Sequence, residues 1–210
     1  MSQYLSDHLA DVLRLTLEHL VLSLMALLIA LCVALPIALW AHGSPNRMRV
    51  VNGIAGAVYS IPSLGLFAMM VPIVGLGTMP TVIGLVLYAQ LMLVAAAVTA
   101  LDGVPEAVRD AALGMGIDRW TILRTVDIPL ALPAFVAGVR TAAVTLIGIA
   151  TVGALIDAGG LGEVILQGIQ RDYSAQILIG AGAVTVLAVS VDCVLSRTES
   201  TLRAHARLSG

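Results

Sequence analysis

The sequence contains no lysine, because all eleven of its Lys and Arg residues are arginines. A phosphate-binding loop of the Walker A type ends in Gly-Lys followed by Ser or Thr, so this chain cannot form one. If the protein works with ATP, the nucleotide must be bound and hydrolysed by a different chain. The sequence therefore predicts no ATPase activity and no bound cofactor of its own.

Charged residues of either sign are scarce. They make up 11% of the 210 residues, against 59% hydrophobic residues, whereas a soluble domain has about 25% charged residues. The net charge of −2 provides no basic field for nucleic acid. We therefore expect an integral protein surrounded by membrane lipid, and at roughly 20 residues per span the length allows about five crossings.

Cysteine and aromatic residues are also few. Cys32 and Cys193 both fall in apolar segments and are far apart in sequence, so they predict neither a disulfide framework nor a metal site. Aromatic residues make up 4% of the chain and form no cluster. An aromatic cage for a cationic ligand is therefore not predicted within this chain alone.

The apolar segments predict an all-α, polytopic membrane fold that occupies residues 1–210 as one transmembrane domain. An amphipathic helix is expected first, over residues 2–15, lying at the membrane surface. A short helix outside the membrane is expected over residues 163–173. The spans are predicted at about 17–40, 50–74, 81–101, 130–156 and 175–195.

The second predicted span is interrupted by Tyr59-Ser60-Ile61-Pro62-Ser63. Proline removes a backbone donor, and such a break is tolerated at membrane depth where it is buried in protein or lines a cavity. An ordinary proline kink explains the pattern equally well. If the break does line a pathway, the candidate lining residues there and in the third span are Tyr59, Ser60, Pro62, Ser63, Tyr88 and Gln90.

The longest polar stretch between two spans, residues 102–129, is named here the 102–129 loop. Pro105 suits the first turn of a helix that Asp102 can cap. We expect Gly114 and Gly116 to end this helix, since glycine accepts a positive φ. Glu106 lies on the same face of it as an acid four residues later, but no histidine, cysteine or nucleophile accompanies them. Catalysis and metal binding are therefore not expected.

The second half of the 102–129 loop predicts another short helix. Asp118 can cap it, and Pro129 is expected to stop it and start the return to the membrane. The loop thus reads as helix, glycine bend, helix.

The arginines predict the orientation of the chain. If the 102–129 loop is cytoplasmic, nine arginines lie on or near that side and only Arg14 and Arg171 lie outside, as the positive-inside rule requires. Five spans then place the N-terminus outside and the C-terminus in the cytoplasm. Asp192, in the last span, is an intramembrane acid and so a functional candidate. It lies near the cytoplasmic end of the span, where Arg197 is close enough in sequence to be its partner, which favours a structural role.

The 102–129 loop resembles the "EAA" coupling loop of ABC importer permeases. That loop reads Glu-Ala-Ala, three residues, Gly, nine residues, then Ile-x-Leu-Pro. Here Asp110-Ala111-Ala112 is followed after three residues by Gly116, and nine residues later by Val126-Asp127-Ile128-Pro129. Asp replaces the family's Glu, and Val and Ile replace its Ile and Leu, but the spacing is intact.

Further stretches are similar to permeases that import quaternary amines such as glycine betaine, choline and carnitine. They are Thr16-Leu17-Glu18-His19-Leu20, Ile61-Pro62-Ser63-Leu64-Gly65-Leu66, Ala137-Gly138-Val139-Arg140 and Ala158-Gly159-Gly160-Leu161-Gly162. Methionine-type permeases share the coupling loop and the last stretch, so they remain an alternative. The chain departs from the family at residues 91–96, where Leu-Met-Leu-Val-Ala-Ala replaces a run like Leu-Pro-Ile-Val-Arg-Asn.

The resemblance implies a type I importer in a bacterial inner (cytoplasmic) membrane. It implies two ABC ATPase subunits that bind the ATP, a second permease chain, identical or paralogous, and an extracytoplasmic substrate-binding protein. The residues implied in ATPase coupling are Glu106, Asp110, Ala111, Ala112, Gly116, Asp118, Trp120, Ile128 and Pro129. A channel or an ion-coupled carrier is disfavoured because no ionisable residue falls at the midplane of a span, and a purely structural assembly subunit is the remaining alternative.

Overall fold

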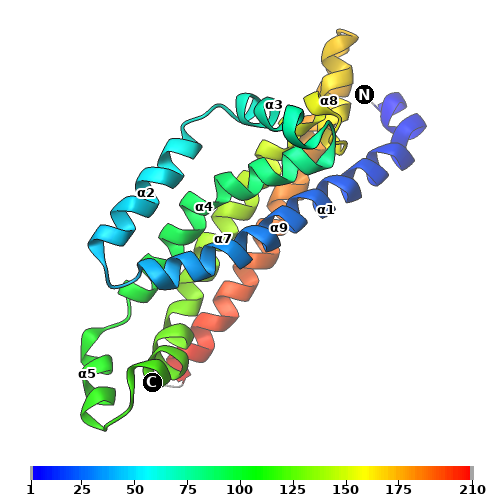
Figure 1. Cartoon of the computed structure of the whole chain (residues 1–210). Helices are drawn as coiled ribbons and strands as arrows, with labels where there is room; N and C mark the ends of the chain where they lie inside the picture. Colours follow the sequence, from blue (N-terminus) through cyan, green and yellow to red (C-terminus); the bar gives the residue numbers. More distant parts are fainter. Residues whose placement is uncertain (1, 209–210) are drawn as a thin grey trace.

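The computed structural model describes residues 2–208, and the side chains of residues 8–204. Every regular element in this part of the chain is helical (Figure 1), which confirms the all-α prediction. The elements are α1 (Ser2–Ala41), α2 (Pro45–Tyr59), α3 (Ser63–Val74), α4 (Thr78–Asp102), α5 (Glu106–Gly114), α6 (Arg119–Ile122), the π-helical η1 (Leu123–Asp127), α7 (Ile128–Ala150), the 3₁₀-helical η2 (Thr151–Ile156), α8 (Leu161–Gln170) and α9 (Ser174–Leu208).

Four helices in the described residues are long and apolar enough to cross a membrane: His8–Ala41, Thr78–Asp102, Arg119–Ile156 and Ser174–Ala204. The pair α2 and α3 passes the same test jointly but is bent by 89° at its break. Counting this pair as one crossing gives the five predicted spans. The third of the unbroken helices is longer than predicted, because α6, η1, α7 and η2 follow one another without a gap.

The amphipathic helix predicted over residues 2–15 is divided by a kink at His8, where the backbone angles are non-helical. From His8 onward the chain belongs to the first membrane-crossing helix, His8–Ala41. The apolar side chains of Val12 and Leu15 are buried against Leu161 of α8 and Leu187 of α9. These residues therefore pack on protein, so the prediction of a helix at the membrane surface was wrong for residues 8–15.

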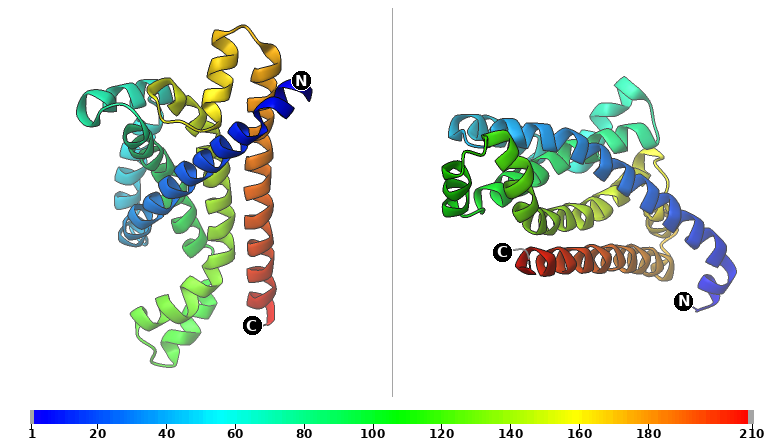
Figure 2. Two further views of the ribbon diagram at one scale, coloured as in Figure 1. Left: turned by 90° about the vertical axis from the view of Figure 1, so that its right-hand side faces the viewer. Right: turned by 90° about the horizontal axis from the view of Figure 1, so that it is seen from below.

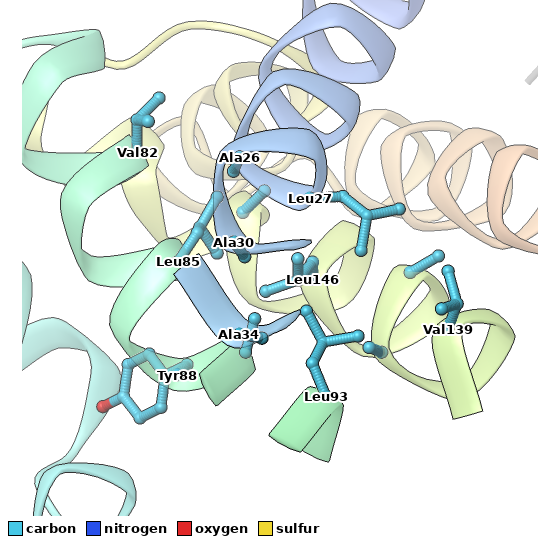
Figure 3. Packing of buried hydrophobic residues seen from close by; sticks show 14 of the residues in the cluster. Ala26, Leu27, Ala30, Ala34, Val82, Leu85, Tyr88, Leu93, Val139 and Leu146 are labelled. Atoms are coloured by element: carbon cyan, nitrogen blue, oxygen red, sulfur yellow. The ribbon is translucent and has the colours of Figure 1, made fainter. Parts of the chain in front are cut away.

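The core lies where α1, α4 and α7 meet. Ala26, Ala30 and Ala34 recur every four residues and so occupy one face of α1. Figure 3 shows this alanine face beside Leu85 and Leu93 of α4, together with Leu146 of α7. Small side chains allow helix backbones to approach closely, which replaces the hydrophobic effect as a source of helix association in lipid.

The two ends of the bundle carry different elements. Figure 1 shows α5 and the C-terminus at one end, and α8 and the N-terminus at the other. We call these the loop end and the far end. Figure 2 shows α9 running straight beside α7 toward the loop end.

Candidate functional site

The first helix of the 102–129 loop is α5. Pro105 is its N-cap residue and provides no side-chain cap. The predicted cap, Asp102, is instead the last residue of α4, and its carboxylate lies 3.1 Å from Nδ1 of His42. The capping prediction was wrong because α4 extends to Asp102, which lies beside His42, the residue just after α1.

Arg109 fastens α5 to the membrane helices. Its Nε donates to Oδ1 of Asp127 at 2.8 Å, and its second guanidinium nitrogen donates to the carbonyl oxygen of Leu101 at 2.6 Å. Asp127 is buried, at 6% exposure. Leu101 lies in the last turn of α4, whose carbonyls have no partner within the helix. One side chain thus links α5 to the end of α4 and the start of α7, and our sequence reasoning missed this link.

A glycine bend follows α5, as the sequence predicts. Gly116 has φ +78 and nothing within 4 Å of the position its Cβ would take, so its backbone conformation alone requires glycine. The Ile117 N–H donates to the Ala112 carbonyl and the Gly116 N–H to the Leu113 carbonyl, which satisfies the end of the helix. Gly114 was expected to share this role, but it is the last residue of α5 and has no positive φ.

Asp118 caps α6, as predicted. Its Oδ1 accepts from the N–H groups of Trp120 and Thr121, each at 3.0 Å, and its Oδ2 accepts from the Thr121 hydroxyl. The Thr121 hydroxyl and then the Thr121 N–H hold the pKa of the Asp118 carboxyl below its usual range. The ionised form is therefore the form that stabilises this turn.

Removing this cap is expected to loosen α6 without unfolding the bundle. Since the pKa of Asp118 is lowered on folding, its contribution is complete above the pKa of Asp in an unfolded chain. It is lost as the pH falls through the lower folded value. Asp118→Ala should speed hydrogen exchange of the Trp120 and Thr121 amides at neutral pH, and wild type should approach the variant in acid. The exposed Asp110, replaced by Ala, is the control; equal exchange in both variants would contradict the cap's role.

The second helix does not end at Pro129, contrary to prediction. Pro129 lies in the first turn of α7, and α6 leads into it through η1. Proline has no N–H to donate to residue 125. The chain adopts a π turn here instead, in which the Ile128 N–H donates to the Leu123 carbonyl five residues back. The helix that starts in the loop therefore continues through the membrane.

The outer surface of the loop exposes apolar side chains. Met115 is 72% exposed and Trp120 56%, with the Arg124 guanidinium 4.5 Å from the centroid of a Trp120 ring. Ala111 is exposed as well, whereas Ala112 is buried. A separate cleft of about 770 Å³, between the loop and the start of α2, is lined by charged residues that include Arg47, Glu106, Asp110 and Arg119. Apolar side chains held on a fixed polar frame are typical of a protein-binding surface.

Catalytic chemistry has no support at this surface. In the described part of the chain, no three His, Cys, Asp or Glu residues gather in a way that could hold a metal ion. Glu106 and Asp110 line one cleft, but arginines share it with them.

The break between α2 and α3 brings most of the predicted pathway residues together. The Tyr88 hydroxyl of α4 donates to the Ile61 carbonyl, which lies in the break. The Tyr59 and Tyr88 rings meet edge to face, with centroids 5.7 Å apart. The Ser60 hydroxyl donates to the Gly56 carbonyl, and Pro62 and Ser63 begin α3. The Tyr88 bond satisfies a carbonyl in the break, as a structure at membrane depth requires, whereas the Gly56 carbonyl also accepts the Ser60 N–H.

Gln90 lies apart from this group. Its amide donates to the Ala30 carbonyl of α1 at 3.3 Å and to the Val86 carbonyl of its own helix at 2.9 Å. It therefore contacts the interface between α1 and α4, and its role in a pathway stays a prediction.

A charge cluster joins α7 to α9. Arg140 lies 2.9 Å from Asp192 and 3.1 Å from Glu199, and Arg203 also pairs with Glu199. The predicted partner of Asp192 was Arg197, so that pairing was wrong. Arg140 comes from another helix and is 52 positions away in the sequence. At that separation, the spacing of residues along one helix cannot predict the pair.

The fold and the loop define a class of protein: a helical membrane subunit whose fixed polar loop is continuous with one of its spans. Residues 33–203 match the family described as binding-protein-dependent transport system inner membrane component, and the chain belongs to that family. It is thus a multi-pass inner-membrane permease subunit of an ABC importer, which confirms the family resemblance.

Individual relatives have names that also state a substrate. Over 157 residues the chain is 39% identical to the "Osmoprotectant import permease protein OsmW" of Salmonella typhimurium (strain LT2), covering 72% of this chain and 73% of that protein. Over 149 residues it is 37% identical to the "Glycine betaine/carnitine/choline transport system permease protein OpuCB" of Bacillus subtilis (strain 168), covering 71% and 69%.

Among solved structures, the chain is similar to one from the MetNI methionine ABC transporter in an inward-facing conformation. The TM-score is 0.83 at 22% identity, over 96% of this chain and 99% of that chain. At this identity the likeness shows the fold alone. It bears out the importer-permease architecture expected from the 102–129 loop.

Proposed function

We propose that this permease carries a small quaternary-amine osmoprotectant, of the type of glycine betaine, choline or carnitine. The observation that supports this substrate class is the 39% and 37% identity to relatives whose names specify osmoprotectants and these three amines. The working unit is two such permease chains, identical or paralogous, with two ATPase subunits and an extracytoplasmic binding protein. The loop end is cytoplasmic, because it is the arginine-rich end, so the N-terminus lies outside.

The 102–129 loop is the surface that the ATPase moves. Arg109 fixes α5 to two membrane helices, and the helix Arg119–Ile156 runs from the loop through the membrane. A force applied at the exposed Trp120 and Met115 therefore reaches a span without an intervening flexible linker. The residues carried over from the coupling-loop resemblance are assigned to this role: Glu106, Asp110, Ala111, Ala112, Gly116, Asp118, Trp120, Ile128 and Pro129. Of these, Ala112 is buried and supports the surface from within.

The Tyr59–Tyr88 pair is the part of the chain best suited to contact a quaternary ammonium group on its way through. The two rings meet at the broken span, and Tyr59 is 42% exposed. An ammonium group is attracted to the face of an aromatic ring within about 6 Å. Tyr88 is buried, at 3% exposure, and its hydroxyl donates to the Ile61 carbonyl. It therefore supports the Tyr59 ring, which is the one that a ligand can reach, with Ser60, Pro62 and Ser63 framing the break.

Reconstitution tests the substrate class. The permease, its cognate ATPase and its binding protein, placed in proteoliposomes, should accumulate labelled glycine betaine, choline or carnitine only with ATP. Uptake of methionine instead would assign the chain to the methionine type. Accumulation without ATP would indicate a carrier, and no uptake of any of these solutes would contradict the proposal.

Docking is tested separately by co-purification. The variant Met115→Ala with Trp120→Ala should lose about tenfold in ATPase retention, since large buried aromatic and apolar anchors dominate interface energies. Ile169→Ala is the matched control, because Ile169 is 59% exposed on α8 at the far end. Equal retention by both variants would remove the docking assignment.

A further inference from the structure

The helix α7 changes its winding at the far end of the bundle. After Ala150 the helix continues as η2, a 3₁₀ segment that covers Thr151–Ile156. The Thr151 N–H donates to the Gly148 carbonyl three residues back. In an α-helix the same N–H would donate to Ile147, four residues back. The change of winding therefore leaves the Ile147 carbonyl without its helical donor.

His19 of α1 supplies the missing donor. Its Nε2 lies 2.9 Å from the Ile147 carbonyl oxygen, and the residue has 0% exposure. Because a carbonyl oxygen only accepts, Nε2 carries the proton. The bond joins residues 128 positions apart and compensates the one carbonyl that η2 frees.

The other ring nitrogen of His19 has no hydrogen-bond partner among the described residues, although it is buried. It faces Gly160, where an added Cβ would lie 2.8 Å from Nδ1. Gly160 has φ +74, and Asp157 and Gly159 are also left-handed. Buried polar groups in native proteins are nearly always paired, and left-handed residues cluster at switch regions. A histidine used only for packing would not account for this combination.

Other elements besides α1 contact η2: the turn before α4, α4 itself and α8. The Gly77 N–H, in the turn before α4, donates to the Ile156 carbonyl at 2.6 Å. A Cβ at Gly153 would lie 2.7 Å from the Thr81 side chain of α4, and one at Gly162 would lie 2.2 Å from the Thr151 carbonyl oxygen. A change in the winding of η2 would consequently be felt by α1, α4 and α8 together.

We propose that His19 is a positioning residue of the transport cycle that selects the 3₁₀ winding of η2 by bonding to Ile147. In the alternative state η2 is α-helical, and the Thr151 N–H donates to the Ile147 carbonyl in place of His19. This inference rests on the proposed import function, because the helix that ends in η2 begins in the ATPase-docking loop.

The 3₁₀ and α-helical forms of η2 differ enough in length to move the loop that follows it. The rise per residue is about 2.0 Å in a 3₁₀-helix and about 1.5 Å in an α-helix, so six residues shorten by about 3 Å on rewinding. The loop of Asp157, Gly159 and Gly160 would move toward the membrane centre by that distance. A single hydrogen bond biases such an equilibrium by roughly two- to tenfold, enough to set which state predominates and weak enough to be reversed in each cycle.

The test uses the complete transporter in proteoliposomes, with ATP hydrolysis and glycine betaine uptake measured together. His19→Leu removes the donor, and His19→Gln keeps an N–H at a similar distance from the backbone. We expect His19→Leu to raise the ATP consumed per substrate by about fivefold, in the middle of the range for one hydrogen bond, and His19→Gln to restore most of the coupling. A parallel fall in both activities, with an unchanged ratio, would mean a merely structural histidine and overturn the proposal.

A second variant covers the case in which His19→Leu does not assemble. In Gly160→Ala the added Cβ would collide with the His19 imidazole. Gly75→Ala is the control, because Gly75 also has a positive φ, +83, but has nothing within 4 Å of its Cβ position. We expect only Gly160→Ala to change the ATP consumed per substrate, and equal values for the two variants would overturn the proposal.

Hydrogen exchange of the Thr151 amide should also differ between nucleotide-free and ATP-trapped wild type. Failure of wild type to import would instead overturn the proposed function.

Discussion

Replacing Arg109 with alanine is expected to abolish ATP-driven uptake and to strip most of the ATPase from the purified permease. The change removes the bond to Leu101 and leaves the buried carboxylate of Asp127 without its cation. Breaking a fully buried pair from one side costs about 3–5 kcal/mol, and because the Arg109 side chain is 25% exposed, the cost here is expected near or below the lower end of that range. In the variant, α5 would then be detached from the ends of α4 and α7 in most molecules. Uptake in proteoliposomes and ATPase retention during purification measure the effect.

The control for this prediction is Arg171→Ala, which removes the same charge at the far end of the bundle and should retain the ATPase. The double variant Arg109→Leu with Asp127→Leu tests the cause, since an apolar pair often substitutes for a buried ion pair at little cost. It should recover ATPase retention relative to Arg109→Ala. Normal transport by Arg109→Ala would show that the anchor of α5 is dispensable.

Gly138→Ala is expected to lower the stability of the helix bundle through a single added methyl group. A Cβ at Gly138 on α7 would lie 2.2 Å from the Cβ of Ala96 on α4. The two core helices must separate to admit it, at a cost of about 1–3 kcal/mol for overpacking. For a chain of this length that lowers Tm by roughly 5 °C. Thermal unfolding of the detergent-solubilised complex measures the shift.

The same helix provides the matched control. Gly148 has nothing within 4 Å of its Cβ position, so Gly148→Ala should leave Tm unchanged or raise it slightly, since alanine favours helix over glycine. Adding Ala96→Gly to Gly138→Ala should recover most of the loss. Equal Tm values for Gly138→Ala and Gly148→Ala would refute the close contact between α4 and α7.

The sequence predicts those features of the loop that depend on a few consecutive residues. Asp118 is followed by free N–H groups that its carboxylate can reach, and Gly116 is the residue that tolerates the bend. Both predictions were confirmed. Two similar predictions failed, for Asp102 and Pro129, because each residue lies where an adjoining membrane helix extends into the loop. Local rules for helix ends do not include that extension.

The contacts that hold the site together could not be predicted in this way. Arg109 and Asp127 are 18 residues apart, and Arg140 and Glu199 are 59 apart. Each pair forms only because two helices happen to end or cross at the same level. The position of such a crossing is determined by the packing of alanines and leucines in the core, which hydrophobic periodicity alone does not align.

The bent pair of α2 and α3 has a consequence for how the chain is made. With 15 and 12 residues, these helices are about 22 Å and 18 Å long, and neither crosses a hydrocarbon layer of about 30 Å alone. The Tyr88 bond that closes their break comes from α4, which is synthesised later. During biogenesis this bond can form only after α4 has been synthesised, so the native packing of the second crossing is completed by the third.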